Sequence, residues 1–164
     1  MVDHVIIKPM ESQLEMEGLA QVHFQSWQET YRGQLSDDYL NQLSYEKCFA
    51  IARRWPENTL VALDSDTVVG FAKYGACEDQ DLCNTGEIKA LYVLASHQKK
   101  KIGYRLMQQV IACMPQYASI ALWVLKGNQK AIDFYLRCGF SFDGKEKKLL
   151  IGTHVTEQRM RYQA

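Results

Sequence analysis

The run Leu91-Tyr92-Val93, followed after four residues by Gln98-Lys99-Lys100-Lys101 and then by Ile102-Gly103-Tyr104, decides how this chain folds. A β-branched and aromatic strand ends, a basic loop follows, and a helix begins at once. This order directs the free backbone N–H groups of the first helical turn at whatever lies beyond the strand. The positive end of the helix macrodipole lies behind them, so these groups form an anion site. The three lysines add full charges, and Gly103 lets a ligand approach the backbone closely.

The sequence therefore predicts a phosphate-binding loop between a strand and a helix. The alternative is a surface loop whose lysines are only solvated, because a strand, a basic loop and a helix often follow one another. Neither glycine-rich phosphate signature, GxGxxG or GxxxxGK[ST], occurs in the chain. His97, beside the loop, is either a phosphate contact when protonated or an ordinary loop histidine.

Composition indicates a single globular domain over residues 1–164. Apolar residues make up 47% of the 164, and the formal net charge is zero, which argues against a nucleic-acid partner. The five cysteines are odd in number and lack a CxxC pair, so we expect reduced, mostly buried thiols, with no disulfide framework and no metal site. The chain has neither a signal-peptide pattern nor an apolar run as long as a membrane span. We therefore expect a cytoplasmic protein without a membrane partner.

Strand-like and helix-like segments alternate along the chain and predict an α/β fold around one mixed sheet. Strands are expected at 5–8, 59–63, 67–74, 87–94, 119–125, 140–148 and 154–162. Helices are expected at 12–31, just after 36–38, at 45–55, at 100–114, and after Asn128. Asn128 is a candidate N-cap, and Gly139 lies where a helix needs a left-handed residue after its end.

Two segments carry a family resemblance. Gln98-x-x-Lys101-x-Gly103, directly after Leu91-Tyr92-Val93, resembles the Q/R-x-x-G-x-G/A acetyl-CoA motif of the GNAT superfamily of N-acetyltransferases, with Lys101 where the family usually has glycine. The second segment, 122–140, is similar to the family's strand, its N-x-x-A-x-x-F-Y helix and its closing G-F. The resemblance implies the GNAT fold, a single central, mostly antiparallel mixed sheet flanked by helices.

The resemblance also implies acetyl-CoA as co-substrate, no metal, and an acetyl transfer to a primary amine. The residues that it assigns to cofactor binding are Leu91, Tyr92, Val93, Gln98, Lys99, Lys100, Lys101, Ile102, Gly103, Tyr104, Asn128 and Tyr135. In this family a bulge in the strand before the loop frees a backbone N–H for the developing oxyanion, and the matching segment here is 91–93. Lys101 is expected either to add a phosphate contact or to hinder the loop.

The catalytic residues implied by the resemblance are Tyr135 and Glu87. Tyr135 would protonate the leaving thiolate, since a phenol with a pKa near ~10 is protonated at neutral pH; the alternative is a core tyrosine on an amphipathic helix. Glu87 would take the proton of the amine directly or through water. It is otherwise a solvent-facing residue at a strand start, and a third alternative is that solvent alone removes the proton.

Sequence says least about the acceptor. Trp27 and Tyr31 are candidates for its walls, or are packing residues. The acidic loop that contains Glu78, Asp79 and Asp81 would attract a cationic amine by its field, or is only solvated. We expect a small-molecule or peptide amine as partner and leave homodimerisation open. The alternatives are an enzyme using another acyl-CoA, and a CoA-binding regulatory or interaction module that has lost catalysis.

Overall fold

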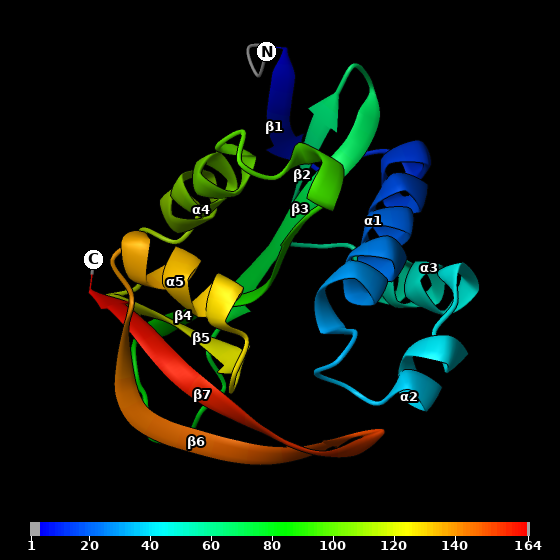
Figure 1. Cartoon of the computed structure of the whole chain (residues 1–164). Helices are drawn as coiled ribbons and strands as arrows, with labels where there is room; N and C mark the ends of the chain where they lie inside the picture. Colours follow the sequence, from blue (N-terminus) through cyan, green and yellow to red (C-terminus); the bar gives the residue numbers. More distant parts are fainter. Residues whose placement is uncertain (1–3, 164) are drawn as a thin grey trace.

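The structure, a computed structural model, describes residues 4–163, and in that part of the chain seven strands form one sheet (Figure 1). The strands are β1 (Val5–Pro9), β2 (Thr59–Asp64), β3 (Thr67–Ala76), β4 (Thr85–Val93), β5 (Ser119–Leu125), β6 (Ser141–Ile151) and β7 (Thr153–Gln163). Their order in the sheet is β1-β2-β3-β4-β5-β7-β6. Neighbouring strands are antiparallel except β4 and β5, which are parallel. This confirms the predicted mixed, mostly antiparallel sheet.

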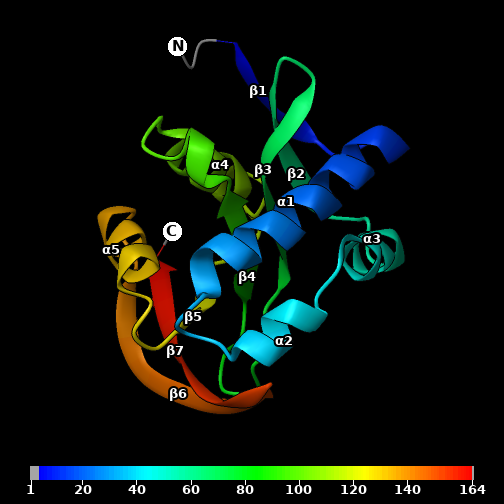
Figure 2. The ribbon, with the colours of Figure 1, turned by 45° about the vertical axis from the view of Figure 1, so that its right-hand side comes forward.

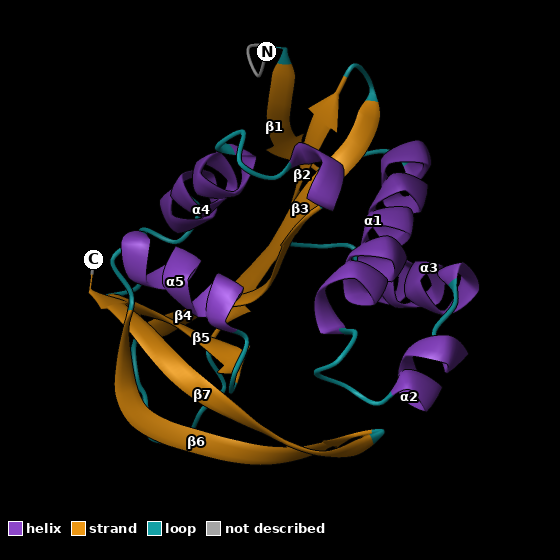
Figure 3. Cartoon of the chain, in the orientation of Figure 1, coloured by secondary structure: helices purple, strands orange, loops and turns teal. Residues whose placement is uncertain are grey.

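Helices cover both faces of the sheet (Figures 2 and 3). They are α1 (Gln13–Tyr31), α2 (Asp37–Gln42), α3 (Tyr45–Arg54), the short 3₁₀ helix η1 (Ala95–His97), α4 (Ile102–Ala112) and α5 (Gln129–Arg137). One buried cluster joins α4 and α5 to the sheet and contains Leu106, Ile132 and Ile120. A second buried cluster joins α1 and α3 to the opposite face of the sheet. It contains Val22 of α1, Ala52 of α3 and residues of the strands. The sheet is therefore the middle of three layers.

Local signals in the sequence explain where the first three helices begin. The Ser12 hydroxyl accepts a hydrogen bond from the Glu15 N–H at 3.1 Å, and the Glu15 carboxylate accepts one from the Ser12 N–H, which is a capping box. Ser36 and Ser44 cap α2 and α3 in the same position. These caps satisfy N–H groups that a helix leaves without internal partners.

Strand β4 contains an irregularity that changes which residues face each layer. Ile88 pairs with Tyr74 of β3 and Ala90 pairs with Lys73, so Lys89 is one extra residue on β4, a β-bulge. Before the bulge Ile88 packs in the α4–α5 cluster, whereas after it Ala90 packs in the α1–α3 cluster. The bulge was predicted for residues 91–93 and lies just before them.

Some expectations need correction. Helix α4 spans Ile102–Ala112, shorter than the predicted 100–114, because residues 99 and 101 both take positive φ angles that a helix excludes. Of the cysteines, only Cys48 is buried and Cys83 is exposed, so the thiols are free as expected but are not mostly buried. Within residues 4–163, no helix has the length and apolar character needed to cross a membrane.

Candidate active site

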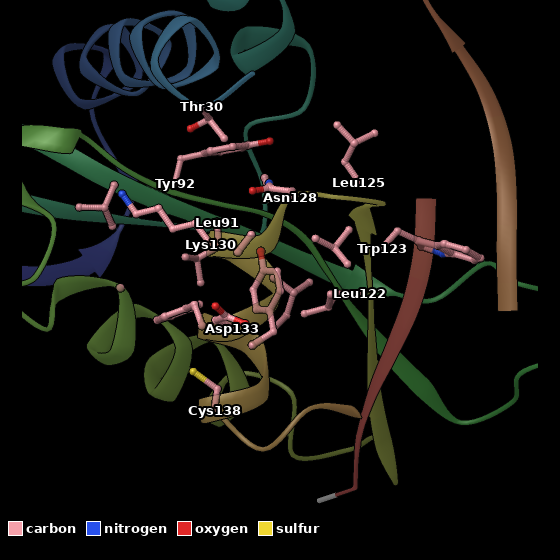
Figure 4. A pocket seen from close by; sticks show the side chains of 18 of the residues that line it. Thr30, Leu91, Tyr92, Leu122, Trp123, Leu125, Asn128, Lys130, Asp133 and Cys138 are labelled. Carbon is pink, nitrogen blue, oxygen red and sulfur yellow. The ribbon is translucent and has the colours of Figure 1, made fainter. Parts of the chain in front are cut away.

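A cavity of about 870 Å³ lies where β4 and β5 separate. In the described chain the two strands pair only from Thr85 to Glu87 and from Ser119 to Ala121, and then they diverge. The diverging segments 88–93 and 122–125 both line the cavity, which we call the cleft. Its walls come from both helical layers. In Figure 4, Thr30 and Tyr92 lie at one end, and Asp133 and Cys138 of α5 lie at the other. The cleft therefore passes through the sheet from one face to the other.

The open edge of β4 offers backbone hydrogen-bonding groups to the cleft. Next to the end of β4, the N–H of Leu94 donates to the Val69 carbonyl of β3 at 2.9 Å. Because N–H and C=O groups alternate between the two edges of a strand, Leu91 and Val93 direct theirs to the opposite, open edge. The Gln98 side chain supports this assignment, since its Nε2 donates to the Val93 carbonyl at 2.9 Å. The N–H groups of Leu91 and Val93 are thus available to a ligand.

The basic loop leads into α4 in an unusual backbone conformation. Lys101 is the N-cap of α4 and has φ 62° and ψ 13°, in the left-handed region, and Lys99 has φ 63°. An L-residue in this region costs roughly 1–2 kcal/mol, and glycine avoids that cost. This explains physically why glycine is usual at the place of Lys101. No side chain among residues 4–163 caps α4, so its first N–H groups remain free for an anion.

Side chains tie this loop to α5 across the cleft. Gln98 bridges the two, because its Oε1 accepts a hydrogen bond from Lys130 Nζ while its Nε2 holds the end of β4. A Cβ added at Gly103 would lie 3.4 Å from the Phe134 ring. That distance is an ordinary van der Waals contact, so Gly103 lies beside α5 and also lines the cleft.

The end of α5 fixes Tyr135. The Phe140 N–H donates to the Tyr135 carbonyl at 3.0 Å and the Gly139 N–H donates to the Leu136 carbonyl at 3.1 Å, which is a Schellman motif with Gly139 at φ 99°. The Phe140 ring lies edge-on to the Tyr135 ring, with their centroids 6.2 Å apart. Burial raises the pKa of Tyr135, so its hydroxyl stays protonated. The predicted helix-ending role of Gly139 is confirmed.

Aromatic side chains form the wall of the cleft on the α1 face. The rings of Trp27 and Tyr31 meet edge to face at 4.9 Å, and the Tyr31 hydroxyl lies 3.1 Å from the Tyr92 hydroxyl. Burial raises the pKa of both tyrosines. The indole N–H of Trp27 is buried and has no hydrogen-bond partner in the described chain. This wall can hold an apolar chain and offers polar groups at fixed places.

Most residues assigned to the site by sequence do line the cleft: Trp27, Tyr31, Leu91, Tyr92, Val93, Gln98, Lys99, Lys101, Gly103, Tyr104, Asn128 and Tyr135. Asn128 precedes α5 as expected, but its side chain makes no capping hydrogen bond within residues 4–163 and it is 5% exposed. A buried amide at the cleft is therefore left for a ligand.

Three predicted residues are not among the described residues that line the cleft. Ile102 is buried in the α4–α5 cluster at 1% exposure, so only its backbone can meet a ligand. Lys100 is exposed and is not among the described lining residues. Glu87 lies at the last paired position of β4, opposite Ala121, at the inner end of the cleft. Burial raises the pKa of the Glu87 carboxyl, which is a property a general base needs.

The acidic loop does not face the cleft as a free negative surface. Asp79 and Asp81 accept hydrogen bonds from the buried Arg159 guanidinium at 3.1 and 2.7 Å, and Asp143 accepts another at 2.6 Å. Trp123 Nε1 also donates to Asp79. Arg159 therefore neutralises part of this charge and anchors the loop to β7, and neither Asp79 nor Asp81 is among the described residues that line the cleft. Attraction of an amine by the field of the loop stays a prediction. His97 is an ordinary loop histidine, 2.8 Å from Asp64.

Several lining residues were not found from the sequence. Lys130 and Arg137 add positive charge on α5, and Glu157 of β7 adds a carboxylate on the α1 face. Burial raises the pKa of Glu157, while Lys147 opposes that shift. The sequence did contain a signal for Lys130 and Arg137, because both lie in the segment 122–140, whose helix is similar to that of the family. It contained no signal for Glu157, because the sequence does not show that β7 lies between β5 and β6.

Comparison with known proteins agrees with this geometry. The model of the acetyltransferase (GNAT) family matches residues 19–140. The chain belongs to the GNAT family. The uncharacterized N-acetyltransferase YuaI of Bacillus subtilis is 32% identical to this GNAT protein over 133 residues, covering 76% of this chain and 75% of YuaI. A spermidine N(1)-acetyltransferase of Thermoplasma acidophilum is 27% identical over 140 residues, covering 79% and 84%.

Solved structures support the GNAT fold over the whole sheet. The PaiA N-acetyltransferase of Thermoplasma acidophilum, in complex with coenzyme A, aligns with a TM-score of 0.73 at 24% identity, covering 98% of this chain and 99% of that one. The protein PH1933 of Pyrococcus horikoshii aligns with a TM-score of 0.76 at 21% identity, covering 98% of both chains. At these identities the alignments establish the fold, which is the GNAT fold predicted from the sequence.

Proposed function

We propose that the chain, as one domain over residues 1–164, transfers an acetyl group from acetyl-CoA to a primary amine of a small molecule or peptide. The observation that carries the proposal is the cleft itself. On the α4–α5 side it offers an open strand edge, the free start of a helix and lysines, which suits a long phosphorylated donor. On the α1 side it offers an aromatic wall, which suits the carbon chain of an amine.

The residues present fit acetyl-CoA, which would supply a thioester as the acetyl donor. The first N–H groups of α4, with Lys99, Lys101, Lys130 and Arg137, would hold the phosphates, since cations and helix N-termini both favour anions. The N–H groups of Leu91 and Val93 would bind the rest of the donor along the strand. An N–H aimed at the thioester oxygen would stabilise the oxyanion, an effect typically of about 10²–10³ in rate.

In the reaction, the amine nitrogen forms a bond to the acetyl carbon and the carbon–sulfur bond breaks. Tyr135 would give its hydroxyl proton to the departing thiolate, because a phenol is protonated at neutral pH. Burial raises its pKa, so donation depends on the negative charge that develops on the sulfur. The amine proton would pass to Glu87, directly or through water along the inner end of the cleft. Solvent would then take the proton from Glu87 and return one to Tyr135.

Three further observations bear on the same proposal. Every one of the five cysteines is a free thiol, which supports action in the reducing cytoplasm. The relative that acetylates spermidine makes polyamines a first group of acceptors to test. Among residues 4–163 there is no group of three or more His, Cys, Asp or Glu side chains arranged to hold a metal ion.

The test is an assay with acetyl-CoA and a panel of polyamines, aminoglycosides, amino acids and peptides. Free thiol is followed over time, and the acetylated product is identified by mass spectrometry. We expect thiol release that depends on the amine, with one N-acetyl product per thiol, above a blank without amine. Tight CoA binding with no amine-dependent thiol release would instead indicate a CoA-binding module.

A further inference from the structure

One carboxylate marks the α1 side of the cleft. Of the described residues that line it, only Asp133 and Glu157 carry carboxylates. Asp133 belongs to α5, on the donor side, and accepts a hydrogen bond from Gln129 at 2.7 Å. Glu157 lies on β7, paired with Leu125 of β5 on one side and with Lys147 of β6 on the other. Its side chain is 21% exposed, so it is partly sheltered from water.

A primary ammonium already lies against this carboxylate. The Nζ of Lys147 is 3.7 Å from Glu157 Oε1 and 4.1 Å from the centroid of the Trp123 ring. A cation over the face of a tryptophan is attracted by the ring electrons, and a carboxylate adds charge. Glu157 and Trp123 both line the cleft, whereas Lys147 is not among the described residues that line it. The chain therefore contains, at the edge of the cleft, a two-sided site for an alkylammonium group.

The lysine holds that site only loosely. A distance of 3.7 Å is beyond hydrogen-bond reach, and the Lys147 side chain is 40% exposed. Ion pairs of this kind contribute little to stability, because solvent screens them and the long side chain loses freedom. A ligand ammonium that also gains contacts along the aromatic wall can therefore displace Lys147 at small cost.

We propose that Glu157 and Trp123 bind a second, non-reacting ammonium group of a diamine or polyamine acceptor, which replaces the Lys147 ammonium there. This inference rests on the proposed acetyl transfer and names its substrate class. The reacting nitrogen has to lose its proton, whereas a carboxylate facing an aromatic ring stabilises the protonated form. The site therefore suits the far end of the acceptor and not the end that is acetylated.

The cleft can hold the two ends of such an acceptor at different places, the reacting nitrogen near Tyr135 and the second ammonium near Glu157. Tyr135 lies on α5 at the donor side, while Glu157 lies on β7 at the α1 side. Tyr31 lies close enough to interact with both residues. Burial raises the pKa of Tyr31, its hydrogen bond with Tyr92 lowers it, and the Glu157 charge raises it again. The Tyr31 hydroxyl in turn acts electrostatically on Tyr135 and adds to the rise that burial causes in the Tyr135 pKa. An alkyl chain along the Tyr31–Trp27 wall would connect the two ends.

The experiment compares 1,4-diaminobutane with butylamine, which has the same carbon chain and one nitrogen. Steady-state acetylation of both is measured for the wild type, Glu157→Gln and Lys147→Met. Glu146→Gln is the control, because Glu146 lies next to Lys147 on β6, pairs with Lys126 and is not a described lining residue of the cleft. Calorimetric titration of the CoA-bound protein with each amine gives binding without turnover.

We expect Glu157→Gln to raise KM for the diamine by about 10–100-fold, the usual size of one charged contact, and to leave butylamine unchanged. Lys147→Met should lower KM for the diamine, and Glu146→Gln should change neither amine. An unchanged diamine preference in Glu157→Gln, or an equal loss in Glu146→Gln, would overturn the inference while acetyl transfer stands. Diamine binding that depends on Glu157 in a protein that acetylates no amine would instead overturn the proposed function alone.

Discussion

Replacement of Lys101 by glycine separates two effects of this residue, the backbone strain at the start of α4 and the contribution of its charge to CoA binding. With φ 62° at the N-cap of α4, the lysine backbone is in the left-handed region, which costs an L-residue roughly 1–2 kcal/mol. Glycine removes that strain but loses about 0.4–1 kcal/mol more backbone entropy on folding. The difference predicts that Lys101→Gly raises the free energy of unfolding by about 0.5–1 kcal/mol, measured by urea unfolding without CoA.

Lys100 is the matched control, because it is the neighbouring exposed lysine and its φ is not positive. Lys100→Gly should lower stability by about 0.5–1 kcal/mol, since only the entropy loss applies there. Affinity should change in the opposite sense at Lys101: its glycine variant should bind CoA a few-fold more weakly at low salt, with a smaller difference at high salt. Equal destabilisation by both variants would refute the strain argument, and tighter CoA binding by Lys101→Gly would show that the lysine hinders the loop.

Three other predictions follow from the site and its supports. Tyr135→Phe should lower kcat by about 10²–10⁴ with CoA affinity nearly unchanged, and a near wild-type rate would make Tyr135 a packing residue. Glu87→Gln should lower kcat above the raised pKa of Glu87, where the carboxylate can take a proton, and least at low pH, where the wild-type carboxyl is itself protonated, with CoA affinity intact in a titration; a wild-type pH profile would leave solvent as the base. Arg159 lowers the pKa of Asp81 to about 2, below its ordinary 3.8, so the pair stabilises the fold above pH ~4 and that stability is lost as pH falls toward 2. Urea unfolding between these pH values should show a steeper loss for wild type than for Arg159→Met, and equal slopes would contradict the assignment.

The sequence predicted those parts of the fold that depend on local signals. The strand 91–93, the loop with three lysines and the Gly139 helix end each follow from residues close together in the chain, and each has its expected position. The helix caps at Ser12, Ser36 and Ser44 also depend on local residues, although the sequence had supplied only the approximate starts of these helices.

Long-range pairing could not be predicted in this way. The position of β7 between β5 and β6 brings Glu157 to the cleft and Arg159 to the acidic loop. Nothing in the local sequence of either residue indicates those partners. The bulge at Lys89 is similar, since one extra residue changes which side chains face each layer, yet a strand with a bulge has the same composition as one without.

The most direct test of the cleft as the acetyl-CoA site is the titration of ¹⁵N-labelled protein with CoA. If the site is as described, the largest amide shifts fall on Leu91 and Val93 of the open strand edge and on residues 99–105 at the start of α4, while amides of β1 and α3 stay nearly still. Shifts concentrated elsewhere, with the amides of Leu91, Val93 and 99–105 unmoved, would contradict the central claim.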